Sequence, residues 1–337
     1  MSAHNIIQFQ SPSNIAIIKY WGKHGNQLPD TPSLSLTLKT AFTSTKMSYR
    51  PLARFSVEYY FEGIRNLLFE EKVVRFMIKM EEYMPFLTGY EFRFESENSF
   101  PHSVGIASSA SSMSALAFCL VVFEEQVTGI NWSQYEFLRR TSWLARQASG
   151  SACRSVYGGW VTWGKTSLVS GSSDEYASPV SSPVHETFNH LCDAVLIVSS
   201  NPKKLSSSLG HELMNFHPFA AGRRQQAEDN FRVLIDALQS GNFNRFATIA
   251  ENEALTLHSL LMTSAPDGLL LKPGSLSIIQ AIKEFREKNG ANICFTLDAG
   301  PNVHLLYPMN ERARVLPFIT DVLLPFCENR QWIDDGI

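Results

Sequence analysis

The sequence predicts a mixed α/β fold, because strand-like and helix-like hydrophobic patterns alternate along its 337 residues. Residues 54–61 and 91–95 alternate polar with apolar or aromatic side chains, as half-buried strands do, whereas residues 67–83 place Leu, Val, Phe and Met at helical spacing. With 44% hydrophobic and 18% charged residues, the chain has the composition of a packed protein with one large or two medium domains.

The next element is a segment rich in glycine and hydroxyl side chains, residues 99–112, which runs directly into an apolar helical segment, residues 113–123. Such a loop can expose backbone N–H groups and the positive end of a helix dipole to a phosphate. Neither GxxxxGK[ST] nor an initial GxGxxG is present, so the two commonest phosphate loops are excluded. An ordinary serine-capped helix explains the segment equally well, and both interpretations stay open on this segment alone.

The helix is expected to reach about residue 127, and a second helix to span about 133–148. The segment 150–164 is strand-like, with Tyr157, Trp160 and Trp163 in it. A polar stretch rich in Pro and Ser, residues 170–183, then interrupts the periodicity. We therefore expect a boundary near residue 185, with domains 1–185 and 186–337.

The C-terminal part is expected to begin with a buried strand at 194–199. Two apolar runs within 293–307 are separated by a turn sequence, AspAlaGlyProAsn, which predicts a hairpin. Amphipathic helices are predicted at 219–239, 243–261, 276–288 and 312–327.

Charge and cysteine content restrict the class of partner. The formal net charge of −3, from 29 basic and 32 acidic residues, gives no general attraction to nucleic acid or anionic lipid. Five scattered cysteines indicate neither a disulfide framework nor a zinc site. No secretory signal is visible, and the longest apolar run, 115–123, is about half of what a bilayer crossing needs. We expect a cytoplasmic protein with a small-molecule partner, and no binding to nucleic acid or membrane.

The first candidate site segment, residues 11–23, carries Asn14 before a strand-like run and Lys19, Tyr20 and Lys23 after it. Two lysines close to an amide and a phenol form a donor-rich edge suited to an anionic ligand. An exposed strand with solvated lysines is the alternative.

Two further segments carry chemistry of their own. Residues 149–154 place small and hydroxyl side chains beside Arg154, whose guanidinium suits bidentate contact with phosphate or carboxylate, although a helix C-cap would explain the glycine. Residues 296–302 place Asp298 on a Gly-Pro turn, where it is either a turn-forming side chain or a carboxylate able to orient or deprotonate a hydroxyl.

Together these segments resemble the diphosphomevalonate decarboxylases of the GHMP kinase superfamily. Four motifs carry the resemblance, in family order: AsnIleAlaIleIleLysTyrTrpGlyLys at 14–23, GlyIleAlaSerSerAla at 105–110, SerGlySerAlaCysArgSer at 149–155 and AspAlaGlyProAsn at 298–302. The segments 102–105, 256–258 and 304–308 look most similar to members from the Bacteroidetes group.

The resemblance implies a two-domain fold with the active site in the cleft between the domains. The N-terminal domain would be similar to ribosomal protein S5 domain 2, and the C-terminal domain an α/β sandwich. It also implies the reaction: ATP phosphorylates the 3-hydroxyl of mevalonate 5-diphosphate, phosphate then leaves, and CO2 is lost to give isopentenyl diphosphate. ATP and Mg²⁺ are the implied cofactors, and a homodimer is the implied assembly.

The resemblance also assigns roles. Asp298 would orient or deprotonate the 3-hydroxyl, Arg154 would hold the substrate carboxylate or diphosphate, and Asn14 would position Arg154. Lys19 is grouped with these catalytic residues and would contact substrate, and Ser109 would face the ATP phosphates. The remaining implied substrate-binding residues are Tyr20, Trp21, Gly22, Lys23, Ser149, Gly150, Ser151, Ala152, Cys153 and Ser208, and the remaining ATP-binding residues are Ser103, Gly105, Ala107 and Ser108.

The chain departs from the common family pattern in two places. His102, Ser103 and Val104 stand where many members have ThrAlaAla, and Ser208 replaces a frequent threonine. Three alternatives remain open: a decarboxylase acting on mevalonate 5-phosphate, a GHMP kinase that phosphorylates a mevalonate hydroxyl, and a nucleotide-binding regulator without activity. Retention of Asp298, Arg154 and Asn14 favours the full reaction.

Overall fold

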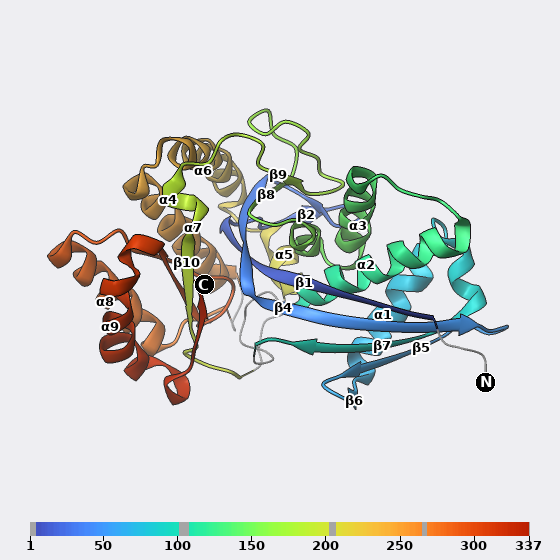
Figure 1. Ribbon diagram of the computed structural model, residues 1–337. Coiled ribbons are helices and arrows are strands. Elements are labelled where there is room, and N and C mark those ends of the chain that lie inside the picture. The colour runs from blue at the N-terminus through green and yellow to red at the C-terminus, as the bar shows by residue number, and fades with distance from the viewer. Residues whose placement is uncertain (1–4, 101–107, 202–206, 265–267, 337) are drawn as a thin grey trace.

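The computed structural model describes residues 5–100, 108–201, 207–264 and 268–336, with Ser207 and Ser208 described by their backbone alone. Over these residues the chain forms two main sheets covered by helices, which confirms the mixed α/β prediction (Figure 1). The strands are β1 (Asn5–Ile18), β2 (Lys23–His24), β3 (Leu28–Pro29), β4 (Ser33–Pro51), β5 (Ser56–Phe61), β6 (Ile64–Arg65), β7 (Tyr90–Asn98), β8 (Trp160–Trp163), β9 (Ser178–Pro179), β10 (Leu191–Leu196), β11 (Cys294–Thr296), β12 (Val303–Pro308) and β13 (Trp332–Asp335). The α-helices are α1 (Leu67–Met80), α2 (Ser108–Thr128), α3 (Gln134–Ala148), α4 (Glu186–Asn189), α5 (Ser207–Met214), α6 (Ala220–Ser240), α7 (Phe243–Ser264), α8 (Pro273–Asn289) and α9 (Arg312–Phe318).

The first sheet is built around β4, which pairs with β1 along one edge and with β7 and β8 at the two ends of the other edge. The register between β1 and β4 shifts between Pro12 and Asn14, so β4 bulges opposite this point. The carboxylate of Asp335, at the end of β13, accepts the backbone N–H groups of Lys39 and Thr40 in the bulge. A bulge re-aims the neighbouring side chains, and here it lies beside Asn14.

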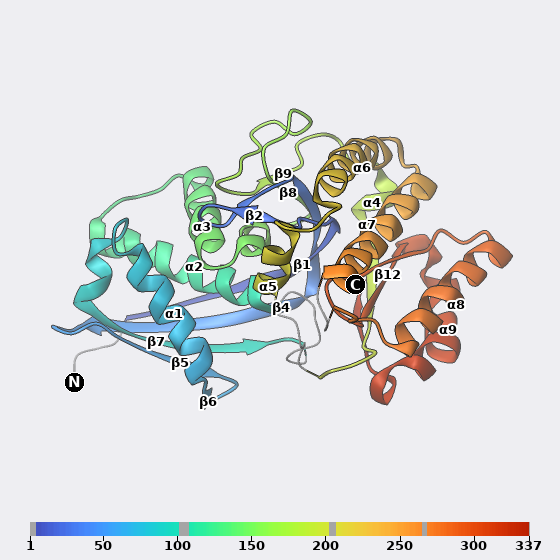
Figure 2. The ribbon, with the colours of Figure 1, turned by 180° about the vertical axis from the view of Figure 1, so that it is seen from behind.

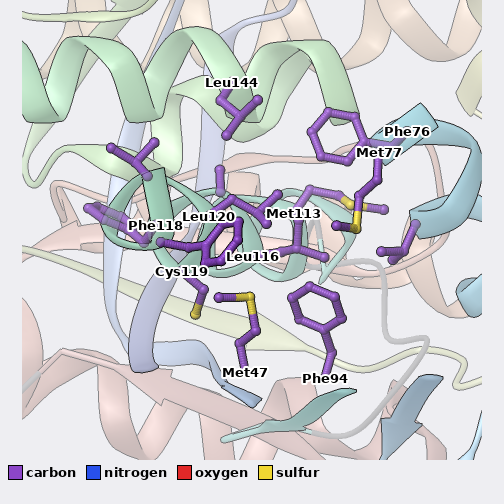
Figure 3. Close-up of a cluster of buried hydrophobic side chains, with 14 of the residues drawn as sticks. Met47, Phe76, Met77, Phe94, Met113, Leu116, Phe118, Cys119, Leu120 and Leu144 are labelled. Carbon is purple, nitrogen blue, oxygen red and sulfur yellow. The ribbon is translucent and has the colours of Figure 1, made fainter. Parts of the chain in front are cut away.

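Helices α1, α2 and α3 cover one face of this sheet. Side chains from the strands, such as Met47 and Phe94, pack against Met113, Leu116 and Leu120 of α2 (Figure 3). In the described part of the chain, α2 is the one helix long and apolar enough to cross a membrane by length and composition, and 78% of its most apolar window is buried inside the molecule. The helix is therefore the centre of the N-terminal core.

The second sheet has the strand order β11-β12-β10-β13, with α8 and α9 on one face. Helices α6 and α7 pack on the other side, where Phe231 and Phe246 share a core cluster with Ile18, Leu34 and Trp160 of the first sheet. In both views α5 lies between the two groups of elements (Figure 1, Figure 2). The apolar core is therefore continuous across the predicted boundary near residue 185, which itself stays a prediction.

Three predicted elements differ from the structure. Helix α2 begins at Ser108, so Ser108–Ser112 are helical and not part of a loop. Residues 150–156 form a 3₁₀ helix, and of the predicted strand 150–164 only Trp160–Trp163 pairs as a β-strand. The predicted helix 312–327 is helical as far as Phe326, but only Arg312–Phe318, which contains Pro317, is α-helical; Ile319–Leu323 form a π-helix and Leu324–Phe326 a 3₁₀ turn.

Candidate active site

Lys19 directly follows the last residue of β1, and its side chain is buried rather than solvated. Its Nζ lies 3.0 Å from Asp298 Oδ1 and also donates to the carbonyl oxygen of Ala16. Burial lowers the pKa of Lys19, and the neighbouring Asp298 carboxylate opposes that shift. The structure therefore rejects the alternative of an exposed strand end and joins two sequence-predicted residues that are 279 positions apart.

Asp298 lies on the turn between β11 and β12, and this turn is fixed by hydrogen bonds from three other elements. His258 Nε2 of α7 donates to the carbonyl oxygen of Asp298 at 3.1 Å. Ser275 Oγ of α8 donates to Pro301 O, and the amide of Asn302 exchanges hydrogen bonds with the backbone of Ser199. The Asp298 side chain keeps 27% exposure, so it is rigidly mounted and still accessible.

Arg154 lies on the 3₁₀ helix and is 3% exposed. Its Nε donates to Asn14 Oδ1 at 3.2 Å and its Nη1 donates to Ser33 Oγ at 2.7 Å. Asn14 in turn donates through Nδ2 to Ser155 Oγ at 2.8 Å. Among the described residues, no carboxylate lies within ion-pair distance of Arg154, and burial lowers the pKa of the guanidinium. A buried cation with only neutral partners is costly, so the geometry suits an anionic ligand.

Tyr20 forms an aromatic wall beside Arg154. Its ring lies 4.4 Å from His211 in a stacked arrangement and 4.8 Å from Trp163 edge-on, and the Arg154 guanidinium carbon lies 5.5 Å from its centroid. Burial raises the pKa of Tyr20 to about 12, although the Arg154 charge opposes that shift. The phenol therefore stays protonated near neutral pH and can donate a hydrogen bond.

His211 lies on α5 and contacts both Tyr20 and Trp21 with its ring. Its Nδ1 accepts the backbone N–H of Gly22 at 3.2 Å. Burial, with the nearby Lys23 ammonium, lowers the pKa of His211 to about 3. The imidazole is therefore neutral at ordinary pH and, with Nδ1 accepting, carries its proton on Nε2.

The remaining predicted residues of the first segment surround this wall. Trp21 is 6% exposed and belongs to an apolar cluster with Met214 and Leu257. Gly22 has φ +102°, and a Cβ there would lie 2.6 Å from Asp30 Oδ2, so only glycine fits. Lys23 is half-buried, with Nζ 2.8 Å from Gln27 Oε1, and burial lowers its pKa.

The small residues 149–153 directly precede Arg154, and Gly150 packs against the Trp163 and Tyr20 side chains. A Cβ at Gly150 would lie 2.7 Å from the Trp163 ring and 3.2 Å from the Tyr20 hydroxyl, so close packing explains this glycine. Ser149 and Ser151 are half-buried, whereas Ala152 and Cys153 are buried. Burial raises the pKa of the Cys153 thiol to about 12, which makes it unreactive as a nucleophile.

The predicted ATP-binding residues are described only in part. Ser108 and Ser109 form the first residues of α2, where Ser109 is exposed and the first turn holds no acidic residue. Ser103, Gly105 and Ala107, as well as His102 and Val104, lie outside the described residues. Ser208 belongs to α5, but its side chain lies outside the description as well.

The described residues contain no group of three or more His, Cys, Asp or Glu side chains that could hold a metal ion. Mg²⁺ prefers octahedral oxygen ligands and commonly binds through substrate phosphates with few protein ligands. The hydroxyls at the start of α2 fit a phosphate-bound Mg²⁺, whereas a cage made of the described side chains alone does not form.

A cavity of about 450 Å³ lies elsewhere, between β1, β4, β8 and α4, and its lining includes Lys39, Trp160 and Asp335 but none of the predicted site residues. The site therefore rests on the convergence of Lys19, Asp298 and Arg154 and not on this cavity. A carboxylate beside an ammonium and a guanidinium can hold an anionic substrate and orient one of its hydroxyl groups.

Sequence analysis missed several residues that build this site. Ser33, His211 and His258 contact predicted residues directly, and Arg223 and Glu253 hold the backbone of Lys19. Ser33 begins a run in which Ser and Leu alternate, a usable strand signal. The others lie on helices, where one polar residue on a buried face gives no signal that separates it from a surface residue.

Two family profiles together match most of the chain. One, described as the diphosphomevalonate decarboxylase-like N-terminal domain, matches residues 11–177, and the other, the mevalonate 5-diphosphate decarboxylase C-terminal domain, matches residues 194–335. A curated relative, the diphosphomevalonate decarboxylase of Schizosaccharomyces pombe, is 29% identical over 91% of this chain and 79% of its own length.

Solved structures agree with this over almost the whole chain. The mevalonate diphosphate decarboxylase of Staphylococcus aureus is 30% identical, with a TM-score of 0.83 over 99% of this chain and 96% of its own. A structure described as MDDEF in complex with MVAPP, AMPPCP and magnesium is 29% identical, with a TM-score of 0.83 over 98% of this chain and 96% of its own.

Proposed function

The chain belongs to the diphosphomevalonate decarboxylase family, and from that premise we propose how its own residues carry out the family's reaction. The reaction is the ATP-dependent decarboxylation of mevalonate 5-diphosphate to isopentenyl diphosphate, ADP, phosphate and CO2. The observation that carries the proposal is the convergence of the Asp298 carboxylate, the Lys19 ammonium and the buried Arg154 guanidinium, whose hydrogen-bond partners among the described residues are neutral.

While the 3-hydroxyl of the substrate is phosphorylated, Asp298 receives the proton of that hydroxyl or orients it. Lys19 Nζ, 3.0 Å from Asp298 Oδ1, places a positive charge beside the carboxylate that would meet the hydroxyl. Phosphorylation turns a poor leaving group, hydroxide, into a good one. When the phosphate leaves, the electrons of the breaking C–C bond form the alkene and CO2 is released.

Arg154 binds an anionic group of the substrate, either the carboxylate or the diphosphate. Its Nε and Nη1 are used by Asn14 and Ser33, which fix the plane of the guanidinium. Its remaining N–H groups can meet the ligand. Tyr20 and the half-buried Ser149 and Ser151 line the same region and are assigned to the diphosphate.

The nucleotide is assigned to the start of α2, where Ser108 and Ser109 and the helix dipole suit phosphate. The complex of a relative with MVAPP, AMPPCP and magnesium supports the use of ATP and Mg²⁺ here. Mg²⁺, when bound, offsets the negative charge on the transferred phosphate. Ser109, exposed in the first turn of α2, is assigned to the ATP phosphates.

The substrate preference is tested by measuring CO2 and ADP release with mevalonate 5-diphosphate, mevalonate 5-phosphate and mevalonate in parallel. We expect CO2 and ADP in equal amounts with the diphosphate alone. Release of ADP without CO2 would indicate a kinase, and release of CO2 from the monophosphate would reassign the substrate. If neither product forms, the protein is a nucleotide-binding protein without this activity.

Two properties predicted from the sequence and the resemblance also remain proposals. A homodimer is expected, and light scattering after size-exclusion chromatography measures it directly. A cytoplasmic location is expected from the reduced cysteines, all five of which are buried and free of disulfide bonds, and fractionation of the source cells tests it.

A further inference from the structure

The backbone of Lys19 is held by an ion pair that lies far from it in the sequence. Arg223 of α6 and Glu253 of α7 are 3% and 0% exposed. Two hydrogen bonds join them, from Nη1 to Oε1 at 2.8 Å and from Nη2 to Oε2 at 2.6 Å. The pair is bidentate and fully buried.

Each member of the pair also binds the main chain of Lys19. The backbone N–H of Lys19 donates to Glu253 Oε2 at 2.9 Å, and Arg223 Nη2 donates to the carbonyl oxygen of Lys19 at 2.8 Å. Asn230 Nδ2 donates to Glu253 Oε1 at 2.7 Å. Each carboxylate oxygen of Glu253 therefore accepts two hydrogen bonds. The backbone N–H of Lys19 is bound by the negative member of the pair and its carbonyl oxygen by the positive member.

Helix α7 also binds the backbone of Asp298, whose carboxylate contacts the Lys19 side chain. His258, five positions after Glu253, donates to the carbonyl oxygen of Asp298. The same helix therefore fixes the main chain of Lys19 at one point and the main chain of Asp298 at another. Between these two attachments, Lys19 Nζ lies 3.0 Å from Asp298 Oδ1.

Stability alone does not account for a pair of this kind. Removing two charges from water costs as much as their attraction returns, and apolar residues of similar volume often stabilise a protein equally well. We propose that the Arg223–Glu253 pair is a positioning device that sets the Lys19 ammonium against the Asp298 carboxylate. The proposal rests on the proposed function, because it assigns to the pair the alignment of two groups placed there in the reaction.

The test is a double variant, Arg223→Gln with Glu253→Gln, which removes both charges and so leaves no unpaired buried ion. A matched control is Arg286→Gln with Glu251→Gln. Glu251 lies two residues from Glu253 on α7, and its Oε1 lies 2.6 Å from Arg286 Nη1 of α8, in a partly buried pair that does not touch Lys19.

We expect the first double variant to lower kcat about 10- to 100-fold and to change KM for mevalonate 5-diphosphate less than about threefold, because small displacements of catalytic groups act mainly on turnover. The control should keep kcat within about twofold when both are compared per folded molecule. Crystal structures of both variants give the distance from Lys19 Nζ to Asp298 Oδ1 without any turnover, and we expect it to lengthen in the first variant alone.

An unchanged kcat, an increase in KM alone, or equal losses of kcat in the two double variants would each overturn the positioning role. A wild-type enzyme that releases no CO2 from mevalonate 5-diphosphate would instead contradict the proposed function. The crystallographic distance would still decide the geometric part in that case.

Discussion

At the scale of single residues, Arg154 shows how a buried charge indicates a ligand. Its guanidinium has neutral partners in Asn14 and Ser33 and, among the residues that the structure describes, no carboxylate. By comparison, Arg140 on α3 is bound by both oxygens of Glu124 at 2.9 and 2.8 Å. A buried arginine with only neutral partners among the described residues suits an anionic ligand.

Arg154→Gln should weaken the binding of mevalonate 5-diphosphate about 10- to 100-fold, since hydrogen bonds to a charged group contribute about 1.5–3 kcal/mol. Titration calorimetry with the substrate in the absence of ATP measures it. Arg140→Gln is the control and should leave the affinity unchanged, although it leaves Glu124 unpaired. Equal affinity of Arg154→Gln and wild type would remove Arg154 from the substrate site.

His211 gives the site a predictable response to pH. Burial lowers the pKa of His211 from its ordinary value of 6.5 to about 3, so between these pH values the unfolded chain binds the proton more readily than the folded protein. The contribution of His211 to the free energy of unfolding is therefore fully present above about pH 6.5 and is lost as the pH falls toward 3. Between about pH 7.5 and 5 the wild type should lose about 2 kcal/mol through this group.

His211→Gln, which keeps an acceptor for the Gly22 N–H, should lack that part of the loss. Urea denaturation of both proteins at the two pH values measures the difference. Parallel losses in the two proteins would show that His211 titrates normally in the folded state.

At the scale of elements, α5 packs closely on Trp21 through Gly210. A Cβ on Gly210 would lie 2.4 Å from the Trp21 ring, whereas a Cβ on Gly222 of α6 would meet no atom within 4 Å. Because α5 also carries His211, its distance from Trp21 determines where the aromatic wall of the site stands.

Gly210→Ala should therefore destabilise the protein by about 1–3 kcal/mol through overpacking. Gly222→Ala, also inside a helix, should stabilise it by up to about 1 kcal/mol, because alanine loses less backbone entropy than glycine. Thermal unfolding of the two variants gives the sign directly. A neutral or stabilising Gly210→Ala would mean that α5 does not pack closely on Trp21.

The sequence predicted elements well where the hydrophobic period was regular. Helix α3 lies within the predicted range 133–148, and Ser133 caps it in a capping box with Glu136. The hairpin of β11 and β12 around AspAlaGlyProAsn is confirmed by its antiparallel register. The predicted helix 312–327 is helical to Phe326, but the apolar spacing did not predict the change from α-helix to π-helix after Phe318, next to Pro317.

Strand β4 was not predicted, although it forms the middle of the first sheet. Its sequence alternates from Ser33 to Leu38, but then Lys39–Ala41 interrupt the period at the bulge. In the bulge the backbone N–H groups of Lys39 and Thr40 donate to Asp335, almost 300 residues later. A contact over that separation cannot be derived from a local pattern.

At the scale of the whole molecule, the site is assembled from segments that only the fold brings together. Sequence analysis named Asn14, Lys19, Arg154 and Asp298, and the structure joins them in two contacts, Lys19 with Asp298 and Arg154 with Asn14. Arg223 and Glu253 could not be predicted from the sequence, because the burial of that pair depends on how α6 and α7 pack against the first sheet.

In the proposed mechanism, Asp298 is the group that starts the chemistry. The direct measurement is single-turnover release of CO2 and ADP from mevalonate 5-diphosphate, ATP and Mg²⁺ by wild type and Asp298→Asn, with ligand binding measured alongside. We predict equal CO2 and ADP in the wild type, and in the variant a loss of rate of about 10²- to 10⁴-fold with nearly normal binding of both ligands. Turnover of Asp298→Asn close to that of the wild type would contradict the account.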